Sequence, residues 1–311
     1  MVEVRAERAS GHPEGITVRA PAKINLHLGV GAPREDGFHP LMTVYHAVDL
    51  YDAVTVTPAE DWSVGVVADG PIDVTGVPLG DTNIAVRAGR ALAAHHGLDR
   101  AARIEIRKGI PVAGGMAGGS ADAAAALVAL DRLWGLASDD TTLFGLAADL
   151  GSDVPFALVG RNALGTGRGE EVEQLPGVES LRWWVVVPAA GDGLSTPAVY
   201  RRFDELIPDA PPQPRAPHRL VEFLEDPDPD VAPLLHNDLQ PAALDLRPDL
   251  AALLEAGEAA GALRGLVSGS GPTCVFLCAD ESGALEVSRS LRASYDVVLV
   301  ASGPVTGALG R

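Results

Sequence analysis

Cysteine is nearly absent from this chain of 311 residues, and its scarcity excludes a disulfide scaffold. The two cysteines, Cys274 and Cys278, both stand in the segment TCVFLC. On a strand they would lie about 13 Å apart on one face, too far for a disulfide. We therefore expect buried thiols and a reducing, cytoplasmic location. The histidines and cysteines show neither His-x-x-x-His nor Cys-x-x-Cys spacing, which disfavours a structural zinc site.

Positive charge and long apolar runs are lacking as well. The net charge is −18 at pH 7, which argues against a nucleic-acid partner. No apolar run reaches the roughly 18 residues of a membrane span, and the charged N-terminal residues are unlike a secretion signal. We expect a small-molecule substrate, no membrane partner, and a monomer or homodimer. The length favours two domains, 1–165 and 166–311.

Lysine is the third scarce residue, and its two occurrences are informative. Only two of the 24 basic residues are lysines, namely Lys23 in PAKINLHL and Lys108 before a glycine-rich loop. A lysine retained in an arginine-rich chain suggests a site that needs a compact point charge on a flexible stem. Retention by chance is the alternative interpretation.

Glycine, by contrast, is concentrated in residues 111–127, PVAGGMAGGSADAAAAL. Residues 102–107 before it alternate apolar and charged, which predicts a strand, and the alanine run after it predicts a helix from about Ser120. A glycine loop that leads into a helix N-terminus offers unpaired N–H groups and the positive end of a dipole, so we expect a phosphate site. A plain helix-capping loop is the alternative. The loop lacks the lysine of a Walker A motif and the spacing of a dinucleotide-binding fingerprint.

Periodicity predicts mixed α and β structure elsewhere. We expect a strand, a proline break and a second strand within 16–30, and strands at 42–56, 62–68, 183–188, 273–278 and 295–302. Helices are expected at 83–96, 140–149, 197–206, 249–260 and 281–294. Residues 151–160 read as a loop running into an apolar strand, and 162–175 as a hairpin. The acidic DPDPD segment, 226–230, favours a solvated linker over a calcium site.

Three motifs together resemble the GHMP kinase superfamily of small-molecule kinases. They are PAKINL near the start, PVAGGMAGGSAD in the middle and SGSGPTCVF at 268–276. The middle motif is similar to the phosphate loop of that superfamily, with Met116 and Ala117 in place of its usual Gly-Leu step. The resemblance implies an α+β, two-domain GHMP-kinase-like fold. Its N-terminal ATP domain would be ribosomal-protein-S5-like, and its C-terminal domain a ferredoxin-like α/β plait.

Further segments resemble the branch of this superfamily that phosphorylates the C2 hydroxyl of a cytidine-diphosphate-linked polyol. They run in order along the chain: PAKINLHL (21–28), DGFHPL (36–41), DTNIAVRA (81–88), GSDVPFAL (151–158), GTGRGE (165–170), STPAVY (195–200) and HNDLQ (236–240). The resemblance implies Asp153 as the catalytic base and Lys23 as its catalytic partner, with ATP and Mg²⁺ as cofactors.

The same resemblance implies which residues bind the two substrates. The ATP-binding set is Asn83, Lys108, Pro111, Val112, Ala113, Gly114, Gly115, Met116, Ala117, Gly118, Gly119 and Ser120, with Ser120 also expected to touch Mg²⁺. The set for the cytidine diphosphate derivative is Asn25, Phe38, His39, Asp153, Thr196 and Tyr200. Phe38 departs from the tyrosine usual in the family, so a ring can stack on the base but a phenol hydrogen bond is lost.

Several alternatives stay open at this point. Asp153 could be a turn or helix-cap aspartate, and His39 an ordinary loop residue. Another superfamily kinase, acting on mevalonate, homoserine or a sugar, is a second possible function, although DGFHPL and GSDVPF argue against it. A non-catalytic nucleotide or sugar sensor on the same fold is a third, but the chain keeps both Lys23 and Asp153.

Overall fold

Two long antiparallel strands, β1 (Ile16–Val30) and β2 (Leu41–Ala59), are the centre of the larger of two sheets. The structure is a computed structural model and describes residues 15–112, 114–175, 181–189, 191, 193–225 and 231–310. Strand order is β3-β4-β2-β1-β8, and β5 pairs with both β2 and β6. The other strands are β3 (Ser63–Ala68), β4 (Ala101–Lys108), β5 (Asn162–Thr166), β6 (Glu171–Gln174) and β8 (His236–Asn237).

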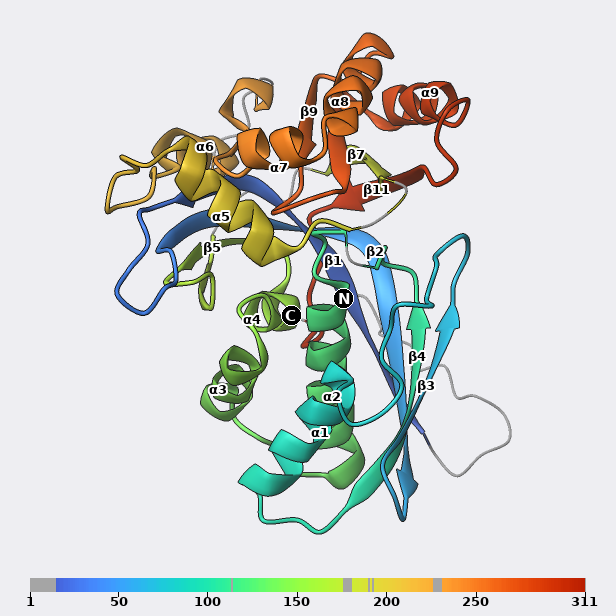
Figure 1. Cartoon of the computed structure of the whole chain (residues 1–311). Helices are drawn as coiled ribbons and strands as arrows, with labels where there is room; N and C mark the ends of the chain where they lie inside the picture. The colour runs from blue at the N-terminus through green and yellow to red at the C-terminus, as the bar shows by residue number, and fades with distance from the viewer. Residues whose placement is uncertain are drawn as a thin grey trace.

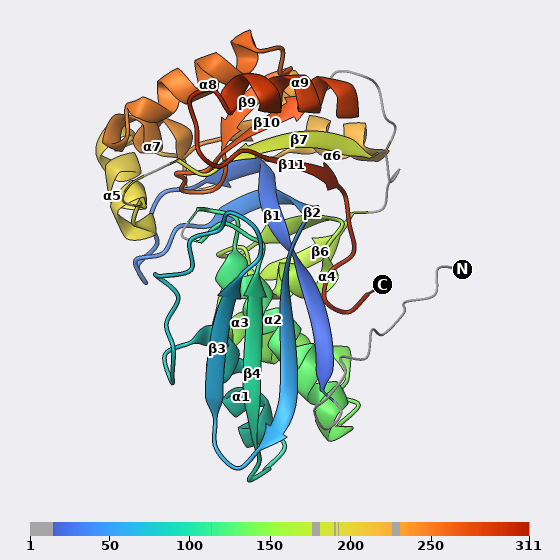
Figure 2. The same ribbon diagram turned by 90° about the vertical axis from the view of Figure 1, so that its right-hand side faces the viewer.

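One face of this sheet is covered by helices. They are α1 (Ile84–His95), α2 (Gly118–Trp134), α3 (Asp140–Leu150) and α4 (Val154–Val159). Figure 2 shows the strands in front and the helices behind them. Every residue of α2 from Ala121 to Leu130 is buried, because the small alanine side chains let the helix approach the sheet closely. In β4 the buried residues alternate with exposed ones, and Lys108 continues the buried face.

The smaller sheet has the order β11-β7-β10-β9, and its strands pair antiparallel. Its strands are β7 (Arg182–Val187), β9 (Arg264–Val267), β10 (Cys274–Cys278) and β11 (Leu299–Gly303). Helices α8 (Asp249–Ala259) and α9 (Glu281–Leu291) lie above it in Figure 1, away from the larger sheet. The remaining helices are α5 (Thr196–Leu206), α6 (His218–Glu225), a 3₁₀ turn (Ala232–Leu234) and α7 (Gln240–Leu246). The first strand stands between the fourth and the third, which is the ferredoxin-like order and confirms the predicted α+β class.

The two sheets are joined by several segments that cross between them. Strand β8 pairs in parallel with β1, and Asp49 of β2 accepts hydrogen bonds from the backbone N–H and hydroxyl of Ser302. Residues 305–309 return to pair with 157–161 of the larger unit. The division at residue 165 stays a prediction, since pairing with the larger sheet continues through β6 and resumes at β8.

Most predicted elements are present, but two predictions were wrong. Residues 154–159 form helix α4 rather than a strand, because Pro155 suits a helix first turn and a short apolar run cannot separate the two periodicities. Residues 16–30 form one strand, in which Pro21 causes a register shift rather than a break. Helix α2 begins at Gly118, before the expected Ser120. The helices α6 and α7 were not predicted, and residues 226–230 lie outside the described residues.

The prediction of two buried thiols is confirmed. Cys274 and Cys278 are both free and buried on β10. Burial raises the pKa of the Cys274 thiol to about 12 and that of Cys278 to about 11, so both stay protonated. Among the helices of the described residues, none has the length and apolar character that a membrane crossing requires.

Candidate active site

A cavity of about 1020 Å³ opens between the two sheets and gathers most of the predicted site residues. Sixteen of them line it: Lys23, Asn25, Phe38, His39, Asn83, Lys108, Pro111, Val112, Gly114, Gly115, Ala117, Gly118, Gly119, Asp153, Thr196 and Tyr200. Met116 and Ser120 do not line it, and Ala113 lies outside the described residues. A cavity of this size can hold two nucleotide-like ligands together.

The glycine loop forms one wall of the cavity. Ala117, with φ of 57°, turns the chain into α2, and no side chain caps this helix. Gly118 and Gly119 line the cavity, and N–H groups in the first turn of a helix lack a partner within it and lie at the positive end of its dipole. The side chain of Met116 is buried in the core, but its carbonyl accepts the backbone N–H of Lys23 at 3.2 Å. The loop is thus tied directly to the strand that carries this lysine.

A second glycine loop, residues 268–271, packs against the first. The Ser268 hydroxyl donates to the Gly115 carbonyl at 3.1 Å. Gly115 has φ of +75°, and a Cβ there would lie 2.2 Å from the Ser268 carbonyl oxygen. A Cβ on Gly269 would lie 3.5 Å from the Lys23 ammonium. Only a glycine at position 115 allows these two backbones to approach so closely, and the second loop thereby lies beside Lys23.

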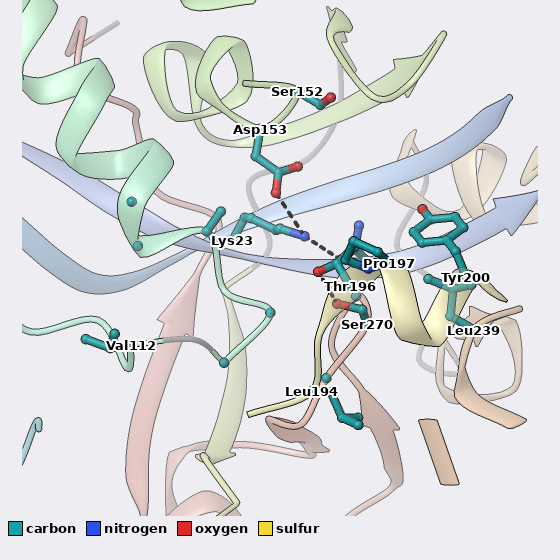
Figure 3. Close-up of a pocket in the computed structure, with 18 of the residues that line it drawn as sticks. Lys23, Val112, Ser152, Asp153, Leu194, Thr196, Pro197, Tyr200, Leu239 and Ser270 are labelled. Carbon is teal, nitrogen blue, oxygen red and sulfur yellow. Dashed lines mark hydrogen bonds and ion pairs between the residues drawn. The ribbon is translucent and has the colours of Figure 1, made fainter. Parts of the chain in front are cut away.

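Lys23 and Asp153 face each other at the centre of this cavity (Figure 3). The Lys23 Nζ donates to Asn25 Oδ1 at 2.8 Å and lies 3.6 Å from Asp153 Oδ2. Lys23 and Asn25 are buried, whereas the Asp153 side chain keeps 30% of its surface exposed. The Asn25 amide donates to the Thr43 hydroxyl, which fixes the oxygen toward Lys23. The ammonium can therefore act on a charged ligand without changing its position.

Asp153 occupies the N-cap position of α4, but its side chain does not cap the helix. Oδ1 instead accepts a hydrogen bond from the Tyr45 hydroxyl at 3.0 Å, and Oδ2 faces Lys23. The carboxylate is thus held from two sides and stays open to the cavity, which suits a group that accepts a proton from a ligand.

The segment from Phe38 to His39 borders the opposite end of the cavity, beside Tyr200 of α5. Phe38 is half exposed, and the Arg168 guanidinium lies 5.0 Å from the centre of its ring. His39 is buried, donates from Nδ1 to the Gly31 carbonyl at 2.8 Å and lies 5.0 Å from the ring of Tyr200. Its Nε2 is 3.5 Å from Asp204 Oδ2. An aromatic ring and a ring nitrogen paired with a carboxylate therefore border this part of the cavity.

Asn83 and Lys108, both predicted to contact ATP, also interact with other residues of the protein. Asn83 accepts the Ala85 N–H, so it caps α1, and it donates to the Pro78 carbonyl. Lys108 is buried between Asp52 and Asp122 beneath Gly118. Burial would lower the pKa of Lys108, but the charges of Asp122 and Asp52 outweigh it and raise the pKa. Both side chains support the cavity wall, and their contact with ATP stays a prediction.

Sequence reasoning missed Tyr45, Arg168 and Ser270, which also line the cavity. The Ser270 hydroxyl lies 2.9 Å from that of Thr196 and so links the second glycine loop to α5. Arg168 and Ser270 stand in the quoted motifs GTGRGE and SGSG, so a signal for them existed. Tyr45 has none, because it lies in a strand and meets Asp153 from 108 residues away.

Comparison with known proteins places the chain in a family. Residues 83–161 match the family model described as GHMP kinases N terminal domain, and residues 223–297 match GHMP kinases C terminal. A relative from Nocardioides sp. (strain ATCC BAA-499 / JS614), named 4-diphosphocytidyl-2-C-methyl-D-erythritol kinase, is 61% identical over 293 residues. This match covers 94% of the chain and 98% of the relative. The chain belongs to the 4-diphosphocytidyl-2-C-methyl-D-erythritol kinase family.

Two solved structures resemble this chain equally in fold and differ in sequence identity. A crystal structure titled 4-(cytidine 5'-diphospho)-2C-methyl-D-erythritol kinase is 33% identical, with a TM-score of 0.72 over 92% of this chain and 98% of that one. A mevalonate kinase from L. major reaches the same TM-score over 94% and 97% but is only 16% identical. The second likeness shows the fold alone. The predicted GHMP-kinase-like fold and kinase activity are confirmed.

Proposed function

We propose that this kinase transfers the γ-phosphoryl group of ATP to the C2 hydroxyl of 4-diphosphocytidyl-2-C-methyl-D-erythritol, a step in making isoprenoid precursors. The observation that carries the proposal is the Lys23–Asp153 pair, 3.6 Å apart, in one cavity with both glycine loops and the Phe38–His39 segment. Family membership supplies the substrate, and the arrangement of these side chains supports the chemistry.

Asp153 acts as the base in this proposal. The substrate oxygen attacks the γ-phosphorus while its proton passes to the Asp153 carboxylate. A new oxygen–phosphorus bond forms as the bond between the γ-phosphorus and the bridging oxygen breaks, and that electron pair leaves with ADP. Lys23 lies beside the carboxylate and can stabilise negative charge that builds on the transferred group. Asn25 fixes the ammonium in place, so no reorganisation is needed when the charge develops.

The two glycine loops bind the phosphates of ATP. The N–H groups at the start of α2 donate to phosphate oxygens, and Gly119, where a Cβ would meet no atom nearer than Ile84 at 3.8 Å, leaves those oxygens room to reach the backbone. The loop at 268–271 covers the phosphates from the side of the smaller sheet.

Mg²⁺, which accompanies ATP in such kinases, fits this site with few protein ligands. In the described part of the chain, no group of three or more His, Cys, Asp or Glu could hold a metal. Mg²⁺ typically keeps several waters and binds through phosphates with one or two protein oxygens. When bound it neutralises charge on the β- and γ-phosphates. Ser120 is the predicted protein ligand, and it would have to reach the metal from the first turn of α2, outside the cavity lining.

The Phe38–His39 segment binds the cytosine in this proposal. Arg168 covers one face of the Phe38 ring, so a base can stack on the other. His39 donates from Nδ1 to a backbone carbonyl, so in this proposal Nε2 is an acceptor, and together with Asp204 Oδ2, 3.5 Å away, it offers two acceptors to the N4 amino group of cytosine. Uracil has a carbonyl at that position and would leave these acceptors unpaired.

The experiment that tests the proposal measures ADP release with a panel of alcohols: 4-diphosphocytidyl-2-C-methyl-D-erythritol, its uridine counterpart, mevalonate and homoserine. We expect release with the first alone to be fast. In the variant Asp153→Asn, kcat should fall by about 10²–10⁴, the usual effect of losing a positioned base, while ATP still binds. ADP release with mevalonate or homoserine at a comparable rate would contradict the substrate assignment. If none of the alcohols caused ADP release, the result would favour a non-catalytic nucleotide sensor.

A further inference from the structure

Tyr45 of β2 contacts the Asp153 carboxylate more closely than Lys23 does. Its hydroxyl donates to Asp153 Oδ1 at 3.0 Å and lies 3.3 Å from the Gly169 carbonyl. The ring is 2% exposed and stacks on Phe156 of α4 at 4.7 Å. The Lys23 ammonium lies 5.5 Å from the centre of the same ring. Tyr45 thus contacts the carboxylate, its helix and the lysine at once.

The phenol of Tyr45 can act only as a hydrogen-bond donor toward this carboxylate. Burial raises the pKa of Tyr45 well above its ordinary value, and the nearby charge of Asp153 raises it further. The hydroxyl therefore keeps its proton at neutral pH. A donor fixed on Oδ1 leaves Oδ2 as the oxygen that faces Lys23 and the cavity.

We propose that Tyr45 is a positioning residue that orients the Asp153 carboxylate, so that Oδ2 meets the substrate hydroxyl beside Lys23. This inference rests on the proposed role of Asp153 as the base. Without the phenol, the carboxylate could rotate about its side-chain bonds, because α4 gives it no capping bond to replace the one lost. A base displaced by a fraction of an ångström lowers the rate of proton transfer while leaving substrate binding almost unchanged.

The same hydroxyl links the base to the turn that borders the cytosine end of the cavity. Gly169 has φ of +103°, and a Cβ there would lie 2.4 Å from the Tyr45 oxygen. The neighbouring Arg168 covers Phe38. The phenol thus sits between the base and the segment that holds the substrate's ring, so the distance between these two parts of the site depends on it.

The test is the variant Tyr45→Phe, which keeps the ring and its stacking on Phe156. We expect kcat to fall about tenfold, the usual effect of losing one hydrogen bond to a charged group, with KM for both substrates changed less than twofold. In an Asp153→Asn background, Tyr45→Phe should cost nothing further, because its effect passes through that carboxylate. Tyr51→Phe is the matched control, since the Tyr51 ring lies beneath Arg19 near the middle of β2, outside the cavity lining, and it should keep the full rate.

The outcomes separate this inference from the proposed function. An unchanged kcat in Tyr45→Phe, with Asp153→Asn impaired, overturns the role of Tyr45 alone. An equal loss from Tyr45→Phe in both backgrounds also overturns it, because the residue would then act independently of Asp153. Full activity in Asp153→Asn overturns the base assignment itself. Thermal unfolding of each variant, expected to match the parent protein, shows that the folded enzyme is being compared.

Discussion

Replacing Lys108 by methionine tests what the buried ion cluster beneath the glycine loop does. The Lys108 ammonium is 2% exposed, pairs with Asp52 and lies 2.8 Å from Asp122 Oδ2. Asp52 also accepts the backbone N–H groups of Gly109 and Ile110, at 2.8 and 3.0 Å. Methionine fills most of the lysine volume but leaves two buried carboxylates close together without a cation. Repulsion between these carboxylates should displace Asp52 from the N–H groups of Gly109 and Ile110, which precede the glycine loop.

The expected magnitude follows from the burial of all three groups. Removing one partner from a buried ion pair costs about 3–5 kcal/mol. Burial raises the pKa of Asp122 well above its ordinary value and raises that of Asp52 too, while Lys108 opposes both shifts. Without Lys108 both pKa values rise further, so the folded variant binds more protons than the unfolded chain. The free energy of unfolding of Lys108→Met should therefore be about 3 kcal/mol below that of the parent protein at pH 8, and the difference should be smaller at pH 5.5.

Urea unfolding at the two pH values measures this effect, with the free energy of unfolding as the readout. The double variant Lys108→Met/Asp122→Asn is the matched control, because it removes one carboxylate charge together with the cation and should recover about half of the loss. A Lys108→Met protein with unchanged stability and a raised KM for ATP would refute the reasoning. It would show that this lysine acts on the nucleotide, as the family resemblance implies, rather than on the loop.

Two further predictions concern the glycine loop and the junction between the sheets. Gly115→Ala should raise KM for ATP at least about tenfold, because its Cβ would separate the two glycine loops. Gly135→Ala is the control, since Gly135 has φ of +65° but no atom within 4 Å of a Cβ, and it should leave KM unchanged. Equal KM values for the two variants in steady-state assays would contradict this prediction. His46 of β2 accepts the indole N–H of Trp184 from the smaller sheet at 3.2 Å, and burial lowers its pKa to about 4. The stability that His46 contributes is therefore full above pH 6.5 and is lost as pH falls toward 4. Between pH 7.5 and 5 the free energy of unfolding of the parent protein, measured in urea, should fall by about 2 kcal/mol more than that of His46→Gln. Equal decreases in both proteins would rule out this role.

The sequence predicts this fold wherever one periodicity dominates a segment. The alternation in 102–107 and the alanine run after Ser120 each allow one interpretation, and both elements form as predicted. Residues 154–159 are apolar throughout, so periodicity could not separate a strand from α4. Pro155 favours a helix first turn here, and packing against α2 and α3, which the local sequence does not contain, favours the same outcome.

The site was predictable where its residues are contiguous. The glycine loop, DGFHPL and GSDVPF are short contiguous motifs, so the residue types within each motif indicate its chemistry directly. The partners of Lys108 are 56 and 14 residues away, and Tyr45 reaches Asp153 across 108 residues. Such pairs depend on the register of β2 against its neighbours, which is set by the whole sheet.

The position of the new phosphate is the most direct measure of the proposed reaction. Phosphorus NMR of the product formed from ATP and 4-diphosphocytidyl-2-C-methyl-D-erythritol would follow the transferred group. The account predicts a new phosphomonoester on the C2 oxygen, formed at a rate that falls about 10²–10⁴-fold in Asp153→Asn. A phosphate on another hydroxyl, or the same product at an undiminished rate in that variant, would contradict it.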